Sequence, residues 1–427
     1  MLQTATYGEF STQIHKRQMG RRAPVEVSIE VTHRCPLECQ HCYNNLPMHD
    51  PQARRQEMTF DEHIHLLDEL VEMGCLWILF TGGEIFARKD FLDIYTEAKK
   101  RGFLITLFTN GTMITPRIAD HLVEYRPFAV EITLYGATRE TYEALTRIPG
   151  SYDRCMKGIR LLRERNLPLK LKTVPTTINF HEVYEMKRFA EQDLGVEFKF
   201  DPLVNPRTDC SQSPLAVRLS PEQVVALDFR DPVRKAEYKK MAEAEQAAIP
   251  QPHGPEKYTC GGGQNGCAVD PQGQLTICVI SHRDGYNLRE GSFAEGWNGK
   301  LQNIRESKRE RQTICTHCRL QSLCSMCPAN GELESGDAET PVEFLCQVAH
   351  LRAYTLGIDV PAHGDCPCCS SGIHTERLKN SAQRLQTELP KFENIVPLFP
   401  SNTPLPVLGQ KGGCSSGGCS SCGTHQG

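Results

Sequence analysis

The sequence lacks the features that would place this protein in a membrane, outside the cell or on nucleic acid. No apolar run approaches the length of a transmembrane helix, and the start at Met1 lacks the charged-then-apolar layout of a signal peptide. The formal net charge is only −4, which provides no general attraction to nucleic acid or to acidic lipid surfaces. We therefore expect a cytoplasmic protein with neither nucleic acid nor a membrane as a partner.

Cysteine, by contrast, is abundant, because the 427-residue chain contains 20 of them. In a protein that is not exported, clustered cysteines indicate metal ligation rather than disulfides. The length predicts two or three domains, and 39% apolar residues suffice for a sizeable core.

The first cysteine cluster follows the apolar run Val25–Val31 and has the spacing CxxxCxxC, with thiols at Cys35, Cys39 and Cys42. Three thiolates on a short loop hold three corners of a four-iron cluster and leave the fourth iron open to an outside ligand. A fourth cysteine close by would have closed the site, but none follows until Cys75. The alternative is a structural zinc site with three cysteines and a histidine, for which His33, His41 and His49 are near in sequence.

A second motif, Gly82-Gly83-Glu84, ends an apolar segment further along the chain. With both motifs in this order, the chain resembles the radical S-adenosylmethionine (SAM) enzymes. The resemblance implies that SAM chelates the open iron of a [4Fe-4S] cluster. An electron from the cluster would split SAM, and the resulting 5'-deoxyadenosyl radical would abstract hydrogen from a substrate. The two glycines lack a Cβ, which lets the backbone approach a ligand closely.

Residues 25–201 alternate strand-like and helix-like segments, which predicts a parallel sheet with helices outside. Thr59 with Glu62 forms a capping box for a helix that runs to Met73, and Thr115-Pro116 begins another. Six units are too few for a closed eight-stranded barrel, and the resemblance implies a partial (β/α)6 barrel, an α/β fold. The six expected strands are Val25–Val31, Leu76–Phe80, Phe103–Phe108, Phe128–Leu134, Leu169–Val174 and Val196–Phe200.

Ligands of α/β folds bind at the carboxyl ends of the strands, so polar residues at these ends are candidates. Thr109-Asn110-Gly111 ends the third strand and Thr133 ends the fourth. In similar enzymes a hydroxyl at the end of strand 4 and a following arginine contact the SAM carboxylate, which points to Thr133 and Arg147. The candidate cofactor-binding residues are Gly82, Gly83, Glu84, Asn110, Thr133 and Arg147.

A polar connection with one amphipathic helix, Pro221 to Ala247, separates these units from a second cysteine-rich region. There Asp270–Gly273 predicts a hairpin turn and Cys278 ends the returning strand. A CxxCx5CxxC series then follows, in which the paired cysteines lie too close for a zinc ribbon. Its cysteines are Cys315, Cys318, Cys324 and Cys327, with Cys346 beyond them.

This series resembles the SPASM domain, which carries auxiliary four-iron clusters behind a radical SAM barrel in peptide- and protein-modifying enzymes. The resemblance departs at Cys327, which follows Cys324 after two residues instead of the usual three. By the ligand order of two-cluster relatives, the first cluster takes Cys260, Cys267, Cys278 and Cys327, and the second takes Cys315, Cys318, Cys324 and Cys346.

These resemblances imply peptide maturation by crosslinking, thioether formation or epimerisation. Sulfatase-maturase-like activity ranks lower, because Val279 stands where those enzymes have an aspartate base. His282 and Asp284 are the candidate bases. A small-molecule radical dehydrogenase remains an alternative, as does a non-catalytic iron-sulfur electron carrier or zinc-binding protein.

The implied partners are a peptide or protein substrate and an electron donor such as a flavodoxin or ferredoxin. The 24 residues before the first strand hold no winged-helix module for a leader peptide, so recognition would use a separate leader-binding protein or the SPASM region.

The C-terminal region carries Asp365-Cys366-Pro367-Cys368-Cys369, a possible helix from His374 to Glu388 and a Gly/Ser/Cys-rich end. Its composition predicts a largely flexible tail, and its thiols are adventitious, handle metal or mimic a peptide substrate. The expected division is an arm (1–24), the barrel (25–201), a linker (202–258), the SPASM domain (259–358) and the tail (359–427).

Overall fold

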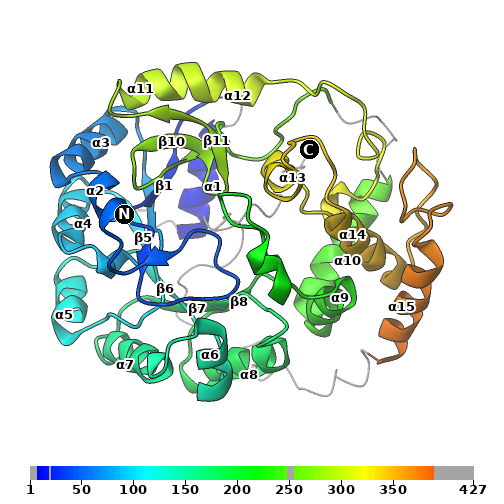
Figure 1. Ribbon diagram of the computed structural model, residues 1–427, viewed down its shortest axis with the longest axis horizontal. Coiled ribbons are helices and arrows are strands. Elements are labelled where there is room, and N and C mark those ends of the chain that lie inside the picture. The colour runs from blue at the N-terminus through cyan, green and yellow to red at the C-terminus, as the bar shows by residue number, and fades with distance from the viewer. Residues whose placement is uncertain (1–6, 19–20, 248–253, 389–427) are drawn as a thin grey trace, which may run out of the picture. The chain divides into compact units, whose positions relative to one another are not determined.

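A computed structural model describes residues 7–18, 21–247 and 254–388 of the chain (Figure 1). The chain forms two compact units, each made of segments distant in sequence. The barrel unit contains residues 22–218 and 261–306. The cysteine-rich unit contains residues 1–21, 219–260 and 307–427. The barrel unit thus includes part of the segment expected to form a separate SPASM domain.

The barrel unit is built on the six predicted strands, and each lies within about two residues of its expected bounds. Neighbouring strands pair in parallel in the order β1-β4-β5-β6-β7-β8, which confirms the α/β architecture. The six strands are β1 (Glu26–Glu30), β4 (Trp77–Thr81), β5 (Leu104–Thr109), β6 (Ala129–Thr133), β7 (Leu169–Thr173) and β8 (Phe198–Phe200).

A hairpin extends this sheet beyond β1, which the sequence did not predict. Strand β9 (Gly266–Val269) pairs in parallel with β1, and β10 (Gln274–Cys278) and β11 (Ser281–Asn287) follow antiparallel, giving nine strands. The predicted turn is confirmed: Asp270 accepts a hydrogen bond from the Gly273 amide, and Gly273 has a φ of 84°. The hairpin covers the otherwise unpaired edge of β1.

Helices lie along the outside of the parallel sheet, as Figure 1 shows. Helix α3 (Phe60–Glu72) begins at Thr59 with the predicted capping box, and α5 (Pro116–Glu124) begins at Thr115. The other helices of this unit are α2 (Pro51–Gln56), α4 (Phe91–Lys100), α6 (Arg139–Thr146), α7 (Ser151–Glu164), α8 (Val183–Arg188), α11 (Phe293–Glu295) and α12 (Gln302–Glu306). A short pair, β2 (Arg34–Cys35) with β3 (Leu46–Pro47), lies in the loop after β1.

The two faces of the parallel sheet differ in polarity. The face toward the helices is apolar and buried, with residues such as Ile29, Phe80 and Leu107. Register partners in a parallel sheet share a face, so Glu131, Thr133 and the lysines of β7 lie together on the other face. Parallel sheets usually bury apolar residues on both faces, so this polar face indicates a chamber rather than a packed interior.

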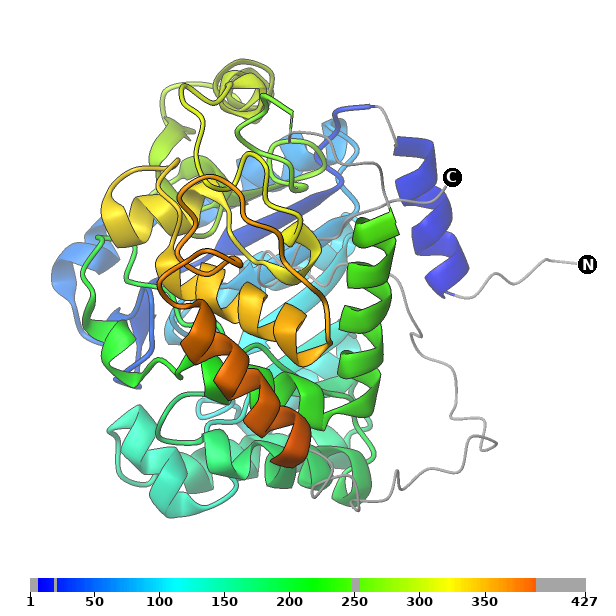
Figure 2. The same cartoon turned by 90° about the vertical axis from the view of Figure 1, so that its right-hand side faces the viewer.

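The cysteine-rich unit is helical. The predicted single helix from Pro221 to Ala247 is two helices, α9 (Pro221–Arg230) and α10 (Pro232–Ala247), because Pro232 holds Asp231 in an extended conformation. Helix α14 (Glu343–Thr355) packs between α9 and α15 (Thr375–Glu388), the orange helix in Figure 2. Two more helices, α1 (Tyr7–Gln18) and α13 (Pro328–Ser335), belong to this unit.

A buried ion pair fixes α14 in this unit. The Arg352 guanidinium donates to Asp228 Oδ2 at 2.6 and 3.0 Å and to the Leu323 carbonyl at 2.7 Å. Because both charges are almost wholly buried, removing either would leave the other unpaired. This pair joins α14 to α9 and to the loop that carries Cys324.

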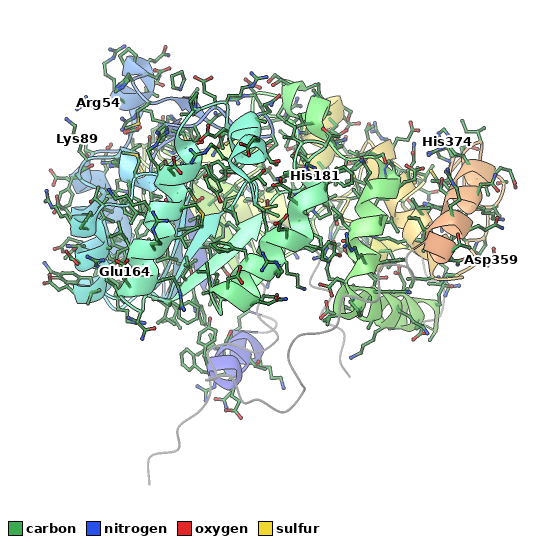
Figure 3. All side chains as sticks on the ribbon, turned by 90° about the horizontal axis from the view of Figure 1, so that it is seen from below. Arg54, Lys89, Glu164, His181, Asp359 and His374 are labelled. Atoms are coloured by element: carbon green, nitrogen blue, oxygen red, sulfur yellow. The ribbon has the colours of Figure 1, made fainter. Side chains whose placement is uncertain are left out.

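The segment after α14 differs from the expected flexible tail, since residues 359–388 fold against α14. Cys366, Cys368 and Cys369 are buried, and Tyr354 donates to the Cys368 carbonyl at 2.8 Å. The possible helix is confirmed as α15, and His374, labelled in Figure 3, lies just before it and pairs with Glu343 at 2.8 Å. The Gly/Ser/Cys-rich end lies outside the described residues.

No helix in the described ranges combines the length and apolar character needed to cross a membrane.

Candidate active site: a three-thiol loop at the strand ends

The loop that carries Cys35, Cys39 and Cys42, here called the thiol loop (residues 32–46), follows β1 at the carboxyl ends of the strands. Its backbone is hydrogen-bonded at several points to neighbouring elements. The Thr32 carbonyl accepts from Gly83 N at 2.7 Å, and Glu38 N donates to the Thr146 carbonyl at the end of α6 at 3.0 Å. The thiol loop is therefore held between β4 and α6.

The glycines at the end of β4 are required by this contact. An added Cβ would lie 2.2 Å from the Thr32 carbonyl oxygen at Gly82 and 2.4 Å from the His33 carbonyl oxygen at Gly83. Gly82 also has a φ of 130°, which side-chain-bearing residues rarely adopt. The two glycines therefore let the strand end approach the thiol loop itself, a reason different from the ligand approach expected from the sequence.

The three thiols lie close enough to interact, and none has a histidine nearby at ligand distance. Burial raises the pKa of each thiol, and the neighbouring thiols raise those of Cys35 and Cys39 further. Among the described residues, the grouping of thiols with histidine at metal-ligand spacing occurs elsewhere, in the cysteine-rich unit. A bound metal supplies the positive charge that keeps such buried thiols ionised.

The histidines that a zinc site would need point to other partners. His33 lies 3.5 Å from Glu30, and the His41 ring packs on Tyr135 with centroids 5.6 Å apart. Burial lowers the pKa of His41 to about 4. Two amide donors instead face the Cys35 sulfur, Leu37 N at 3.4 Å and Asn110 Nδ2 at 3.5 Å. Three thiols with N–H donors suit an iron-sulfur cluster, whose potential depends on hydrogen bonds to sulfur.

Glu84 joins two strand ends rather than facing an outside ligand. Its carboxylate accepts from the Thr109 hydroxyl at 2.7 and 2.9 Å, from Asn110 N at 2.8 Å and from Phe86 N at 3.2 Å. These bonds occupy both oxygens of a side chain that is 1% exposed. Burial raises the pKa of this carboxyl to about 7 despite the donors. The structure thus assigns Glu84 to positioning the ends of β4 and β5.

The other sequence candidates lie around the same strand ends. Asn110 donates to Cys35 and accepts from Thr112 N at 2.9 Å, so its amide orientation is fixed. Thr133 ends β6 on the polar face of the sheet. Arg147, in a left-handed conformation after α6, donates to Gln40 Oε1 at 3.1 Å. All three therefore border the thiol loop or the chamber that it caps.

In the cysteine-rich unit, four of the expected ligands line one cavity: Cys315, Cys318, Cys324 and Cys346. Cys327 instead neighbours Cys260. This separation agrees with the two ligand sets that the resemblance implied, for the cysteines of this unit.

The remaining two expected ligands belong to the β9–β10 hairpin of the barrel unit. The register pairs Ala268 with Thr276, so alternation places Cys267 and Cys278 on opposite faces of the hairpin. Cys267 is buried and interacts electrostatically with Cys75 and Arg22. This arrangement argues against one cluster binding both thiols, and it leaves Cys278 as the better placed of the two.

The candidate bases gain no support. Asp284 is exposed and pairs with Lys300 at 3.1 Å, as a surface residue does. His282 belongs to β11, but its side chain lies outside the described part of the structure.

Sequence reasoning missed a lysine in the chamber and three residues beside the thiol-lined cavity. Lys172 of β7 lies over the Phe108 ring and 3.5 Å from Glu131. Burial lowers the pKa of Lys172 to about 7, against the opposing effect of Glu131. The alternation Leu-Lys-Leu-Lys-Thr in β7 was the available signal, since a strand buried on both faces would be apolar throughout. The residues beside the cavity are His350, His363 and Cys366.

The fold and the site define an α/β enzyme with a partial parallel barrel and a three-thiol, cluster-binding loop after its first strand. The radical SAM superfamily matches residues 29–190, and the SPASM iron-sulfur cluster-binding domain matches residues 260–319. The chain belongs to the radical SAM enzymes that carry a SPASM domain.

Two kinds of curated relative cover most of the chain. An AdoMet-dependent heme synthase of Methanosarcina barkeri is 27% identical over 74% of this chain and 94% of its own length. A PqqA peptide cyclase of Rhodopseudomonas palustris is 25% identical over 70% of this chain and 80% of its own length. Among solved structures, SuiB of Streptococcus suis bound to precursor peptide SuiA has a TM-score of 0.57 at 13% identity, covering 78% of this chain and 80% of SuiB.

Replacing Gly82→Ala tests the contact between β4 and the thiol loop. The clash with the Thr32 carbonyl should lower the free energy of unfolding by about 2–4 kcal/mol and reduce iron at the loop. Thermal unfolding and iron analysis would measure both. The control is Gly102→Ala, where φ is 89° but no atom lies within 4 Å, so only backbone strain of about 1 kcal/mol is expected. Equal effects of the two variants would contradict the proposed contact.

Replacing Asn110→Asp tests the hydrogen bond to the Cys35 sulfur. The variant keeps the oxygen that binds Thr112 but loses the donor, so the cluster potential should fall. Loss of about 1 kcal/mol corresponds to a shift on the order of 40 mV for one electron, and the new charge adds to it. Anaerobic redox titration followed by electron paramagnetic resonance would measure it. Thr112→Ala keeps the sulfur donor and should leave the potential nearly unchanged; an equal shift there would contradict the assignment.

Proposed function

We propose that this enzyme abstracts hydrogen from a peptide or protein substrate during peptide maturation. When bound to the thiol loop, a [4Fe-4S] cluster and SAM supply a 5'-deoxyadenosyl radical by reductive cleavage of SAM. Cys35, Cys39 and Cys42 hold that cluster, and the observation that carries the proposal is their convergence on a loop fixed between β4 and α6.

The residues around the loop prepare the chamber for this chemistry. Glu84 fixes the two central strand ends, while Asn110 donates to a cluster thiolate. Thr133 and Arg147 supply a hydroxyl and a guanidinium that suit the SAM carboxylate, because a guanidinium can donate twice to one carboxylate. The polar face below them leaves a chamber in which a substrate can meet the radical away from bulk water.

A peptide substrate is supported by the relatives and by the size of the chain's second thiol-rich region. PqqA peptide cyclases match up to 70% of the chain, and SuiB shares the fold in a structure with a precursor peptide bound. The implied partners are an electron donor of the flavodoxin or ferredoxin type and, for leader recognition, a separate protein or the SPASM region. Two auxiliary clusters are proposed, and Cys278 is favoured over Cys267 as a ligand of the first.

A second candidate is a tetrapyrrole substrate, because the AdoMet-dependent heme synthase of Methanosarcina barkeri matches over nearly its whole length. The lysines of β7 and β8 on the chamber face suit carboxylate groups. They are, however, already paired with Glu131 and Glu197, which favours the peptide reading.

Anaerobically reconstituted enzyme tests the reaction class and the substrate together. With SAM and a strong reductant, the wild type should form 5'-deoxyadenosine, and a Cys35→Ala/Cys39→Ala/Cys42→Ala variant should not. Addition of peptides encoded by neighbouring genes should raise the yield and change a peptide's mass, whereas tetrapyrrole precursors of heme should not. Absence of 5'-deoxyadenosine contradicts the enzyme class; stimulation by a tetrapyrrole alone contradicts the peptide.

We assign the role of chamber base to Lys172, in place of His282 and Asp284. An amine with a pKa of about 7 is neutral in a large fraction of molecules at neutral pH and can then accept a proton. It lies on the register partner of Thr133, beside the proposed SAM carboxylate site.

Lys172→Met should lower product formation by about 10²-fold or more, while SAM cleavage without product continues. In the wild type, kcat/KM should rise as pH increases through about 7, because the lysine loses its proton in that window. Liquid chromatography with mass detection would follow both products across pH. The control is Lys170→Met on the same strand, whose amine pairs with Glu197 at 2.8 Å. An unchanged pH profile in Lys172→Met would contradict the role.

A further inference from the structure

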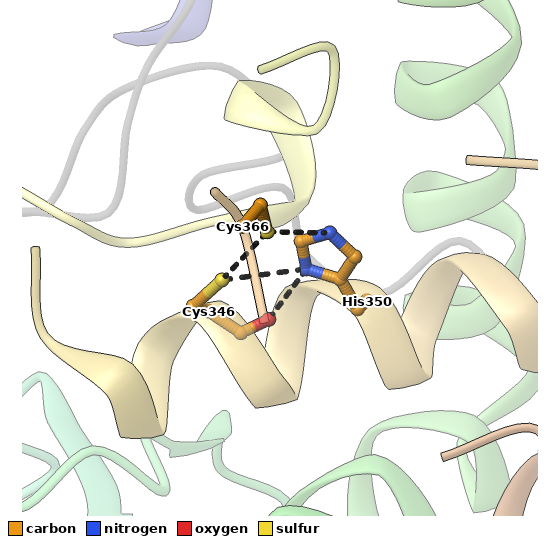
Figure 4. A group of neighbouring side chains, drawn as sticks. All are labelled: Cys346, His350 and Cys366. Carbon is orange, nitrogen blue, oxygen red and sulfur yellow. Dashed lines mark hydrogen bonds between the residues drawn. The ribbon is translucent and has the colours of Figure 1, made fainter. Parts of the chain in front are cut away.

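Three side chains of the cysteine-rich unit form a compact group at the edge of the thiol-lined cavity. Cys346 and His350 are one helical turn apart on α14, and Cys366 comes from the segment that follows it (Figure 4). The ligand atoms all lie within 4.8 Å of one another. The two sulfurs are 3.8 Å apart, and Cys366 Sγ is 3.6 Å from His350 Nε2.

These spacings match the edges of a tetrahedron around one metal ion. With Zn–S bonds of about 2.3 Å and Zn–N bonds of about 2.0 Å, tetrahedral edges are about 3.8 Å between sulfurs and about 3.5 Å between sulfur and nitrogen. Thiolates on different irons of one four-iron cluster point away from each other, so their sulfurs lie much further apart. Cys346 and Cys366 are therefore too close to ligate two irons of the same cluster.

The histidine is oriented as a metal ligand. His350 Nδ1 lies 2.8 Å from the Cys346 carbonyl oxygen, which can only accept, so Nδ1 carries the hydrogen. Nε2 is left with its lone pair and is the atom that faces Cys366. Metal-binding histidines commonly donate their second ring N–H to a carbonyl in this way.

Burial and charge also favour a divalent cation. His350 is 1% and Cys366 is 3% exposed, so ionised thiols here need a compensating positive charge. Two thiolates and a neutral imidazole around a doubly charged ion leave the site without net charge. The thiol of Cys368 hydrogen-bonds to that of Cys346 and is a candidate for the fourth position.

We propose that Cys346 Sγ, Cys366 Sγ and His350 Nε2 bind a single zinc ion, separate from the auxiliary cluster held by Cys315, Cys318 and Cys324. The site fastens the segment 359–369 to α14 beside that cluster. Cys346 then no longer serves as the cluster's fourth cysteine. One iron of that cluster is left to a ligand other than Cys346.

Metal analysis of full-length protein purified without oxygen tests the site. We expect about one zinc per chain in addition to the cluster iron. Zinc X-ray absorption of the wild type should show at least two sulfurs and an imidazole. Cys366→Ser and His350→Gln should weaken zinc affinity by at least about tenfold with iron content unchanged. The matched control is Cys369→Ser, a buried neighbour whose thiol donates to the Cys366 carbonyl at 3.2 Å, which should keep its zinc.

Four results would overturn the zinc site, and the wild-type spectrum remains decisive where a variant does not fold. They are wild-type protein without zinc, a zinc shell of sulfur only, loss of iron rather than zinc in Cys366→Ser, and equal zinc loss in Cys369→Ser. A thiol-to-cobalt charge-transfer band after exchange with Co²⁺ should be present in the wild type and absent in Cys366→Ser. These readouts do not depend on SAM cleavage, so the site can fail while the proposed function stands.

Discussion

The active site depends on one close backbone contact, in which the end of β4 lies directly against the loop that follows β1. The Thr32 carbonyl accepts from Gly83 N at 2.7 Å, in a space that a single Cβ on either glycine would fill. The thiols are placed by this contact because the loop has few apolar residues of its own to bury. On the other side the loop is held by backbone bonds to the end of α6. The cysteines are thus positioned by main-chain hydrogen bonds, while their sulfurs stay available to a metal cluster.

The same strand ends explain why the site is polar yet well ordered. Glu84 is buried with a full set of donors from the neighbouring strand, so a charge that would be costly alone joins β4 to β5. Asn110, one residue on, is held by Thr112 and turns its amide toward Cys35. Lys172 and Glu131 repeat this logic deeper in the chamber. The sheet therefore holds polar groups rigidly on the face that meets the substrate and apolar groups on the face that meets the helices.

Local signals in the sequence sufficed for the strands, for the Thr59 capping box and for the turn that ends at Gly273. Each of these depends on residues close in sequence, where alternation, capping and turn chemistry act. The attachment of β9 to β1 could not be predicted this way, because strand pairing between residues 26 and 266 is a tertiary contact. The same holds for Glu84, whose position followed from the motif but whose partners come from another strand. The break at Pro232 was readable and was missed, since the flanking amphipathic pattern is continuous across it.

The order in residues 359–388 shows how composition misleads when cysteine is abundant. The segment has few large apolar residues, and a disordered tail follows from that count alone. Buried cysteine behaves as a small apolar residue, however, and three of them lie in this segment. Backbone bonds complete the packing: Ser370 N donates to Val360 O at 3.2 Å and Tyr354 donates to Cys368 O at 2.8 Å. Sulfur thus does two jobs here, since the thiols that fill the space under α14 are also those that bring Cys366 to His350, and a metal ion bound there adds the enthalpy that the short apolar contacts lack.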